Sequence, residues 1–498
     1  MNPHRAPKPV DEFDDSPIKH PSQLPKNSDG KTPHVMIVGA GIGGLFLAIL
    51  LDKAGIPYEI YERSPEVRPL GSVMALNSNI LGVLEQLDIY EDFKKISLPS
   101  KVFNLFYGDM KKIATLNTND VEEAVGYDYR LFARPDFYAL LQSRVPAEKI
   151  HFNKKVLSMQ QNKEGVMIRC ADGTTYHGDI LVGADGAYSA VRQHLYRTLK
   201  DQGVLPESDK KDLSKGYICL VGVTCGLDPI KYPYVTNVDS VQHSVIGKGT
   251  RYTWTIFNVP GNRICWVAVA QLATLAEAEL LKFRNSEWGP ESNAEMIAEC
   301  KDFKLPIGTT LGDLIDQTPK DKISRVFLEE KLFETWSHNR TVLIGDAAHK
   351  LLPSAGQGAV CAMQDAVILA GCLYDLPSLS PDSIRAALQD YQDQRYSHVK
   401  EQFGISKTNA IFLHGQTLSE RLIRYAAFNL IPKAIKNKQS LRGAAYRPQV
   451  TFLPRAPKRG TVKEVPQKPS VRYAREQEES KKTAAVEATV PMPSAEAV

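Results

Sequence analysis

Residues Arg340–Asp365 read RTVLIGDAAHKLLPSAGQGAVCAMQD and contain two glycine-rich breaks. The apolar run that opens this segment stops at Gly345-Asp346, and the second break, Gly356–Gly358, precedes a helical pattern over Ala359–Leu373. A strand that ends on Gly-Asp, with a glycine-rich helix start nearby, can present one carboxylate and several free backbone N–H groups to a single ligand. The segment therefore predicts part of a binding site at the end of a strand.

A second glycine-rich motif, GAGIGG at Gly39–Gly44, follows a short β-branched strand and opens an apolar helix. In such a loop Gly39 permits the tight turn, Gly41 lets a pyrophosphate approach the backbone, and Gly44 lets the helix pack closely on the strand. Glu62 ends the next strand, where its carboxylate can accept hydrogen bonds from ribose hydroxyls and repels a 2′-phosphate. The motif predicts the adenosine site of FAD or NAD, and the alternative is an ordinary glycine-rich turn. Two such elements far apart in the chain suggest one long cofactor held at both ends.

The apolar run Val35–Leu51 contains no charged residue and has two interpretations. A membrane span needs about 20 apolar residues, which is longer than this run. The glycines inside it have phosphate-loop spacing, so we expect a strand, a loop and a helix rather than a span.

The bulk composition is typical of a soluble globular protein. The 498 residues leave room for about two or three domains. The net charge of +4 gives no reason to expect a nucleic-acid partner. The seven cysteines form no CxxC pair, which favours reduced structural thiols and argues against a zinc site. The N-terminus lacks a secretory pattern, and the expected location is cytoplasmic.

Several further motifs occur in a fixed order between the two glycine-rich segments. After Glu62-Arg63 come Gly71-Ser72, Arg134 and Gly183-Ala184-Asp185-Gly186, and then Gly345-Asp346. In this order they resemble the FAD-dependent monooxygenases of the aromatic-hydroxylase type, including fungal secondary-metabolite members. The resemblance covers roughly residues 34–400 and depends on the combination of motifs rather than on any one of them.

The resemblance implies a role for each matching residue. The FAD pyrophosphate would lie on the first glycine loop, and the adenosine ribose on Glu62 beside Arg63. The backbone at Ala75 and the side chain of Arg134 would lie near the flavin, Asp185 would serve both FAD and the nicotinamide cofactor, and Asp346 would bind the ribityl chain. The candidate cofactor-binding residues are Gly39, Gly41, Gly44, Glu62, Arg63, Ala75, Arg134, Asp185, Asp346, Pro353, Gly356, Gly358 and Ala359. No catalytic acid or base is assigned.

Three of the neighbouring residues have a plainer interpretation. Arg134 could be a surface arginine in a salt bridge, His349 is better explained by packing than by general-base catalysis, and Asp365 better by orienting the loop than by chemistry. Many members of the family carry Asn where this chain has Val360, which removes one polar side chain near the flavin and leaves the backbone contacts to hold it.

The order of elements implies an α/β fold with a discontinuous Rossmann-like FAD-binding domain, an inserted mostly antiparallel β-sheet substrate domain and C-terminal helices. Composition predicts disorder at both ends of the chain. In the middle sheet Tyr217, Tyr252, Trp254 and Trp266 could line a pocket, and core packing explains them equally well. The predicted units are 1–32 and 456–498 (disordered), 33–100, 130–215 and 335–400 (FAD-binding), 101–129 and 216–334 (substrate), and 401–455 (helical).

The resemblance implies a single-component monooxygenase. No second GxGxxG follows a strand, so NAD(P)H would bind transiently, with NADPH favoured over NADH by family precedent. Reduced flavin would react with O2 to a C4a-hydroperoxide, which would hydroxylate or epoxidise an aromatic or lipophilic small molecule. The alternatives are a flavin-dependent reductase or dehydrogenase on the same fold and a non-catalytic carrier of prenylated proteins.

The segment Leu418–Lys438, LSERLIRYAAFNLIPKAIKNK, is partly amphipathic and basic. It could place the protein at a membrane surface. The competing interpretation is a helix that packs on the folded domain and exposes a solvated basic face. Nothing after residue 400 is long and apolar enough for a predicted span.

Overall fold

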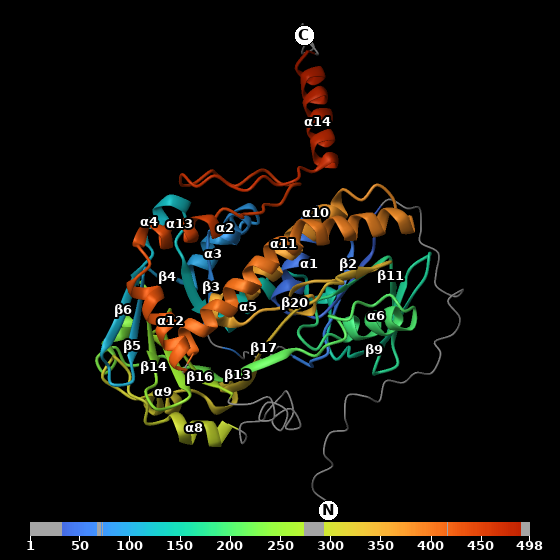
Figure 1. Cartoon of the computed structure of the whole chain (residues 1–498). Coiled ribbons are helices and arrows are strands. Elements are labelled where there is room, and N and C mark those ends of the chain that lie inside the picture. The colour runs from blue at the N-terminus through green and yellow to red at the C-terminus, as the bar shows by residue number, and fades with distance from the viewer. Residues whose placement is uncertain (1–31, 67–70, 72, 273–292, 416, 490–498) are drawn as a thin grey trace, which may run out of the picture.

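A six-stranded sheet forms the centre of the structure, a computed structural model that describes residues 32–66, 71, 73–272, 293–415 and 417–489 (Figure 1). Its strands, in order across the sheet, are β18 (Ser337–His338), β19 (Thr341–Leu343), β12 (Ile180–Gly183), β1 (Val35–Val38), β2 (Tyr58–Tyr61) and β8 (Ile150–His151). Only β18 runs antiparallel to its neighbour. Because the carboxyl ends of parallel strands meet at one edge, the loops that follow β1, β12 and β19 are brought together there.

Two apolar helices pack together beside this sheet. Helix α1 (Ile42–Ala54) is buried along most of its length, as expected for a helix between a sheet and another helix, and it ends at Gly55 in the left-handed conformation. It packs on α10 (Gly358–Tyr374), which in turn packs on α11 (Pro381–His414). The apolar run at residues 35–51 is thus a strand, a loop and a buried helix.

An eight-stranded sheet forms the second large unit of the molecule. It is antiparallel except where β14 pairs with β5. Its strands, in spatial order, are β20 (His349–Lys350), β17 (Ser324–Leu332), β13 (Ser214–Val223), β16 (Arg263–Gln271), β15 (Tyr252–Val259), β14 (Val241–Ile246), β5 (Val102–Tyr107) and β6 (Lys112–Asn117). The edge strand β20 begins three residues after Asp346, so the segment that leaves the six-stranded sheet passes directly into this one.

The predicted aromatic residues of the middle sheet divide between two clusters. Tyr252, Trp254 and Trp266 belong to a core cluster with α8 (Ala294–Cys300) and α9 (Leu311–Asp316), and the Trp254 ring stacks on Phe303 at 4.3 Å. Core packing therefore explains these three. Tyr217 lies in a separate cluster with Leu352 and Ala410, on the side of the sheet that contacts α11.

Smaller elements complete the two units. One three-stranded sheet, in the order β3-β7-β4, packs its Ala75, Leu131 and Ala133 against Phe257 and Cys265 of the large sheet. The other has the order β11-β10-β9. The remaining strands are β3 (Val73–Leu76), β4 (Leu98–Pro99), β7 (Arg130–Ala133), β9 (Val156–Gln161), β10 (Val166–Cys170) and β11 (Thr175–Gly178). The remaining helices of the folded body are α2 (Ser78–Gln86), α3 (Tyr90–Lys95), α4 (Asn119–Val125), α5 (Arg134–Gln142), α6 (Ala190–Asp201), α12 (Leu418–Asn429) and α13 (Lys433–Gly443), with short 3-10 turns η2 (Ala147–Lys149), η3 (Pro233–Thr236), η5 (Lys320–Lys322), η6 (Gly345–Ala347) and η7 (Pro353–Ala355).

The predicted fold class is confirmed: a split α/β nucleotide-binding unit, an inserted mostly antiparallel sheet and C-terminal helices. The sequence predicts a helix over residues 382–403, and in the structure this helix continues to His414, where Ala410 packs on the large sheet. The sequence also predicts a helix over residues 276–281, and those residues and residues 1–31 lie outside the described part of the chain.

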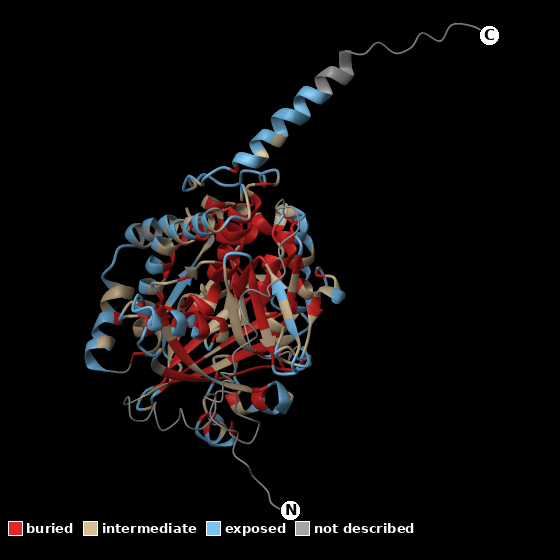
Figure 2. Cartoon of the chain, turned by 90° about the vertical axis from the view of Figure 1, so that its right-hand side faces the viewer, coloured by how far each residue is buried: buried red, intermediate tan, exposed pale blue. Residues whose placement is uncertain are grey.

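The C-terminal segment differs from the predicted disordered tail. Residues 456–470 run along the body, where Thr461 N donates to Ala124 O at 2.8 Å and Arg459 pairs with Glu85 at 2.6 Å. Helix α14 (Val471–Thr489) then projects away from the molecule with an almost wholly exposed surface (Figures 1 and 2). Composition indicates correctly that this segment has no apolar face to bury, but hydrogen bonds and ion pairs fix its course.

Candidate functional site

The first glycine loop is shaped by close backbone contacts. Gly39 has a φ of +106°, and a Cβ there would lie 2.5 Å from the Ala184 carbonyl oxygen. A Cβ on Gly44 would lie 2.1 Å from the Gly39 carbonyl oxygen. By contrast, a Cβ on Gly41 would meet nothing within 4 Å. Gly39 and Gly44 are therefore required by the fold itself, whereas the open side of Gly41 leaves room for a phosphate group to approach the backbone, as FAD requires.

Glu62 lies at the end of β2 and binds this loop. Its Oε2 accepts a hydrogen bond from Ala40 N at 2.9 Å, and its Oε1 accepts one from Ser64 N at 2.9 Å. Each carboxylate oxygen can accept a further hydrogen bond, so these contacts leave capacity for ribose hydroxyls. Tyr138 Oη supports the same loop by donating to Ala40 O at 2.7 Å. Arg63 is exposed beside Glu62.

Asp185 follows β12 and caps the start of α6. Its Oδ2 accepts from Ala190 N at 2.7 Å and from Val191 N at 3.2 Å. Its Oδ1 is buried and has no hydrogen-bond partner among the described residues. Burial raises the pKa of this carboxyl group. A buried acceptor without a partner is costly, and a hydroxyl of a bound ligand could satisfy it.

Arg192 connects the turn after Asp185 to the turn around Asp346. From α6 its guanidinium donates to Ala187 O at 2.6 Å and to Ala347 O at 2.8 Å. Burial lowers its pKa, although the charges of Asp185 and Asp346 oppose this effect. Two loops that are far apart in the sequence are thereby held in one arrangement.

Asp346 lies in η6, directly after β19, and has two cationic neighbours. It forms an ion pair with Lys350 of β20, and 34% of its side chain is exposed, which leaves it accessible to a ligand. Burial lowers the pKa of Arg134, and the charge of Asp346 opposes that shift. The side chain of Arg134 also packs on Gly71, whose φ of +110° and close contact favour glycine. The carboxylate thus lies where ribityl hydroxyls could reach it.

A buried ionic network holds the loop that contains Asp346. Asp365 of α10 accepts a hydrogen bond from Gly345 N at 2.9 Å, lies 2.6 Å from His349 Nε2, and accepts from Arg395 Nε at 2.8 Å. The side chains of all three titratable residues are 0% exposed. Burial would raise the pKa of Asp365, but the charges of His349 and Arg395 outweigh it and the pKa is lowered. Asp365 therefore orients the loop, and His349 serves as its structural partner.

The resemblance implies that Pro353 and Gly356–Ala359 lie beside the flavin ring, and in the structure Gly356 lies next to β3 and to Tyr129, the residue before β7. Gly356 ends η7 with a φ of +63°, and a Cβ there would lie 3.4 Å from Tyr129 Oη and 4.0 Å from Ala75 Cβ. Helix α10 then begins at Gly358 without a side-chain cap at Gln357. The positive end of this helix and its first N–H groups are available to a negatively charged partner.

The other residues of this segment vary in exposure. Pro353 is exposed, whereas Ala359 is half-buried. Val360, which stands where many members of the resembled family have Asn, is 1% exposed and packs in the main core. An apolar core contact therefore replaces a polar side chain at this position.

Three residues of this region, Tyr129, Arg192 and Lys350, were not among the predicted site residues. Burial raises the pKa of Tyr129 to about 12 and keeps its hydroxyl group neutral beside Gly356. Lys350 could have been found from its spacing, because a lysine four residues after Asp346 can pair with it. Tyr129 and Arg192 belong to no motif, and only the tertiary fold shows where they lie.

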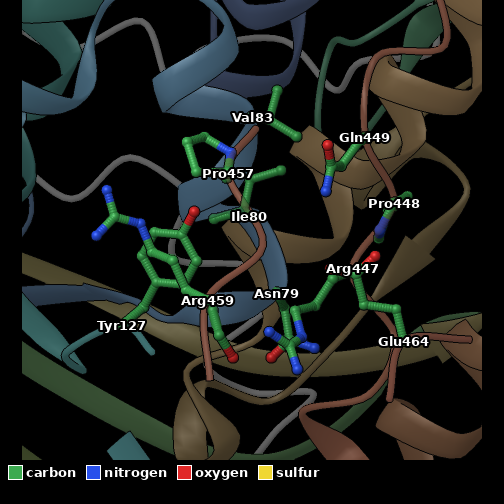
Figure 3. A pocket seen from close by; sticks show the side chains of 12 residues that line it. Asn79, Ile80, Val83, Tyr127, Arg447, Pro448, Gln449, Pro457, Arg459 and Glu464 are labelled. Carbon is green, nitrogen blue, oxygen red and sulfur yellow. The ribbon is translucent and has the colours of Figure 1, made fainter. Parts of the chain in front are cut away.

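A small hollow elsewhere in the molecule is a packing feature rather than part of this region (Figure 3). It lies between α2, Tyr127 and the C-terminal segment, and it includes Arg447 and Arg459. Arg447 donates to Val125 O at 3.0 Å, and Arg459 pairs with Glu85. These contacts hold the C-terminal segment on the body, and none of the candidate cofactor residues lines the hollow.

The family comparison matches the parts of the chain that form these loops. A family model for the FAD binding domain matches residues 32–209 and 300–402. The chain is 30% identical over 443 residues to the FAD-dependent monooxygenase ausM of Emericella nidulans, a match that covers 85% of this chain and 88% of that protein. It is 29% identical over 389 residues to the FAD-dependent monooxygenase ptmM of Penicillium ochrochloron, covering 75% and 87% of the two chains.

Solved structures share the architecture at lower identity. Klebsiella pneumoniae HpxO complexed with FAD and uric acid superimposes with a TM-score of 0.66 at 19% identity, over 83% of this chain and 97% of that one. The 2,6-dihydroxypyridine-3-hydroxylase from Arthrobacter nicotinovorans gives a TM-score of 0.61 at 20% identity, over 78% and 95%. At this level of identity the structures support the fold.

Proposed function

Because this chain belongs to the FAD-dependent monooxygenase family, we propose that it uses NAD(P)H and O2 to hydroxylate or epoxidise an aromatic or lipophilic small molecule. One observation supports the proposed site above all: the loops after β1, β12 and β19 contact one another at a single sheet edge. A Cβ on Gly39 would meet Ala184, and a Cβ on Gly43 would lie 3.7 Å from Ile344 Cδ1. Three separate parts of the chain thus lie side by side at the carboxyl edge of a parallel sheet, which is where α/β folds bind dinucleotide cofactors.

The residues present suit FAD. We assign the pyrophosphate to the open side of Gly41, the adenosine ribose to Glu62, and the ribityl chain to Asp346. Asp185 Oδ1 supplies a buried acceptor that needs a donor. When bound, FAD supplies the redox chemistry that activates O2 for transfer of one oxygen atom to the substrate.

The protein residues orient the reaction and exclude water. The uncapped start of α10 at Gly358 would stabilise negative charge on the flavin side of the site. Leu352, directly before Pro353, lies in one apolar cluster with Tyr217 and Val269 of the large sheet. This contact supports a substrate position between that sheet and the 353–359 segment, where an apolar lining would exclude water.

The alternatives of a non-catalytic carrier and a flavin-dependent reductase are disfavoured. Family membership supports a monooxygenase, and a carrier that does no redox chemistry would have no need of Asp346 and the Pro353–Gly358 segment. No observation in the described residues favours reduction of a carbon–carbon double bond over oxygen transfer.

The proposal is tested with the purified protein, isotopically labelled O2 and an organic extract of the source organism. We expect a flavin absorbance spectrum, faster flavin reduction by NADPH than by NADH, and one labelled oxygen atom in the product. Substrate-dependent oxidation of NADPH without label in any product would identify a reductase and contradict the proposal. Asp346→Asn serves as the matched variant, because it should lose both bound flavin and product.

A further inference from the structure

Exposed apolar side chains are concentrated on α12, the turn that follows it and the start of α13. Seven of the fifteen exposed large hydrophobic residues in the described part of the chain lie within this short stretch, whereas the other eight are scattered. These residues are Leu418 (77% exposed), Leu422 (69%), Ile423 (48%), Tyr425 (60%), Leu430 (68%), Ile431 (42%) and Ile435 (57%). We call them the α12–α13 apolar surface. Single exposed apolar residues are ordinary, but a contiguous group indicates an interaction site.

The orientation of α12 is fixed by polar contacts on its opposite side. Arg424 is 3% exposed and donates to Phe412 O at 2.7 Å and to Gly415 O. A capping box between Thr417 and Glu420 fixes the start of the helix. Since Leu418, Leu422 and Tyr425 follow one another at helical spacing and are all exposed, docking through Arg424 leaves all three on the outer face of α12. The apolar face is therefore directed outward, not packed on the domain.

The same stretch is strongly basic. Residues 417–445 contain six basic residues, Arg421, Arg424, Lys433, Lys436, Lys438 and Arg442, and one acidic residue, Glu420, which gives a net charge of +5. Arg424 is used inside the fold. Arg421, Lys438 and Arg442 are exposed, and Arg442 lies 4.0 Å from Glu401. Aliphatic side chains next to an excess of positive charge suit a binding partner that has an anionic outer layer and an apolar interior.

We propose that the α12–α13 apolar surface docks the protein on an anionic membrane surface. Leu430 and Ile431, exposed in the turn between the helices, would enter the boundary between headgroups and acyl chains, and the exposed Lys438 and Arg442 of α13 would contact the headgroups. None of the helices in the described ranges is long and apolar enough to cross a bilayer, so the contact is peripheral. This inference does not depend on the identity of the substrate.

Two other binding partners for the α12–α13 apolar surface fit the observations less well. A second copy of the chain would bring two surfaces of the same positive charge together in a symmetric interface. A protein partner would be expected to meet a surface rich in aromatic residues and poor in lysine, whereas this one has a single aromatic residue, Tyr425, among aliphatic ones.

The experiment is co-sedimentation of the full-length, flavin-loaded protein with phosphatidylserine–phosphatidylcholine vesicles and with phosphatidylcholine vesicles. We expect binding to the anionic vesicles only, and release at high salt. Replacing Lys433, Lys436 and Lys438 by Gln should weaken binding about a hundredfold, at about fivefold per residue. The combined Leu422→Ser, Leu430→Ser and Ile431→Ser variant should abolish it.

Matched control variants show whether vesicle binding depends on this surface or on any exposed apolar or basic residues of the protein. The first control combines Ile230→Ser and Val238→Ser, which removes two apolar residues that are 89% and 83% exposed. The second control replaces three exposed lysines, Lys301, Lys320 and Lys322, by Gln. Neither control should change vesicle binding, and flavin content and thermal stability should be equal in all variants. Absence of vesicle binding, equal binding to both vesicle types, or a dimer in light scattering that Leu422→Ser dissociates would each overturn the proposal.

Discussion

The Gly39–Gly44 loop and the Gly345–Gly358 segment meet at one edge of the same sheet but are held there by different interactions. The first is fixed by backbone contacts between residues a few positions apart and by the neighbouring Ala184. The second depends on Asp365 and Arg395, buried charged residues from two other helices. The first loop is thus held mainly by close packing of main-chain atoms, whereas the second is held by buried charged side chains. Substitutions that disturb only one kind of support will show how far the two loops are independent.

The largest effect is expected from Arg395→Leu. This substitution leaves Asp365 buried without its cationic partner, and we expect the free energy of unfolding to fall by about 3–5 kcal/mol. Urea unfolding measures the loss. The control is Arg385→Leu, whose exposed pair with Asp382 should contribute at most about 1 kcal/mol. A combined Arg395→Leu and Asp365→Leu variant should recover part of the stability, and simple additivity would contradict the pairing.

Asp346→Asn tests the second segment without disturbing its support. The side chain is partly exposed, so the free energy of unfolding of the apoprotein should differ from that of the unsubstituted protein by at most about 0.5 kcal/mol. Flavin affinity should fall by about 1.5–3 kcal/mol, the usual worth of hydrogen bonds to a charged group. Titration of apoprotein with FAD, followed by fluorescence quenching, gives the affinity. Unchanged affinity would remove Asp346 from the site, and Asp382→Asn is the control at an exposed, arginine-paired aspartate.

A pair of alanine substitutions tests the first loop. Gly44→Ala places a Cβ 2.1 Å from the Gly39 carbonyl oxygen, so the apoprotein should lose about 1–3 kcal/mol of stability. Gly41→Ala meets no protein atom within 4 Å and should leave apoprotein stability nearly unchanged while weakening FAD binding. Thermal unfolding with and without FAD separates the two effects. Equal behaviour of the two variants would refute the distinction between a packing glycine and a phosphate-facing glycine.

The smallest expected effect is a pH dependence of folding stability that arises from His398 of α11, the helix that also carries Arg395. Burial and then the charge of Arg395 lower the pKa of His398 to about 3, whereas an unfolded histidine has a pKa of about 6.5. Between these values the unfolded chain binds more protons, so stability falls as the pH is lowered through this window. At pH 5 the loss should be about 1–2 kcal/mol. His398→Gln should reduce this dependence in urea unfolding, and an unchanged dependence would contradict the assignment to His398.

The contrast between the two loops also explains which features the sequence can predict. The strand, loop and helix over residues 35–54 are local, and the sequence predicts a strand over residues 34–38 and a helix over residues 43–53, within one residue of the observed bounds. The roles of Arg192, Arg395 and Tyr129 arise from contacts between distant segments and have no spacing that would reveal them. Polar composition at the C-terminus likewise gives no indication that residues 456–470 follow the body, because single hydrogen bonds and ion pairs determine that course.

Strand β20 has a mechanical consequence for the proposed enzyme. Lys350 belongs to the edge of the eight-stranded sheet, opposite Lys331 of β17, and is also the ion-pair partner of Asp346. The residue that would grip the ribityl chain is therefore tethered both covalently and electrostatically to the sheet that would face the substrate. A displacement of that edge would be transmitted to Asp346 across four residues, so occupancy of one side of the molecule can change the strain on the other.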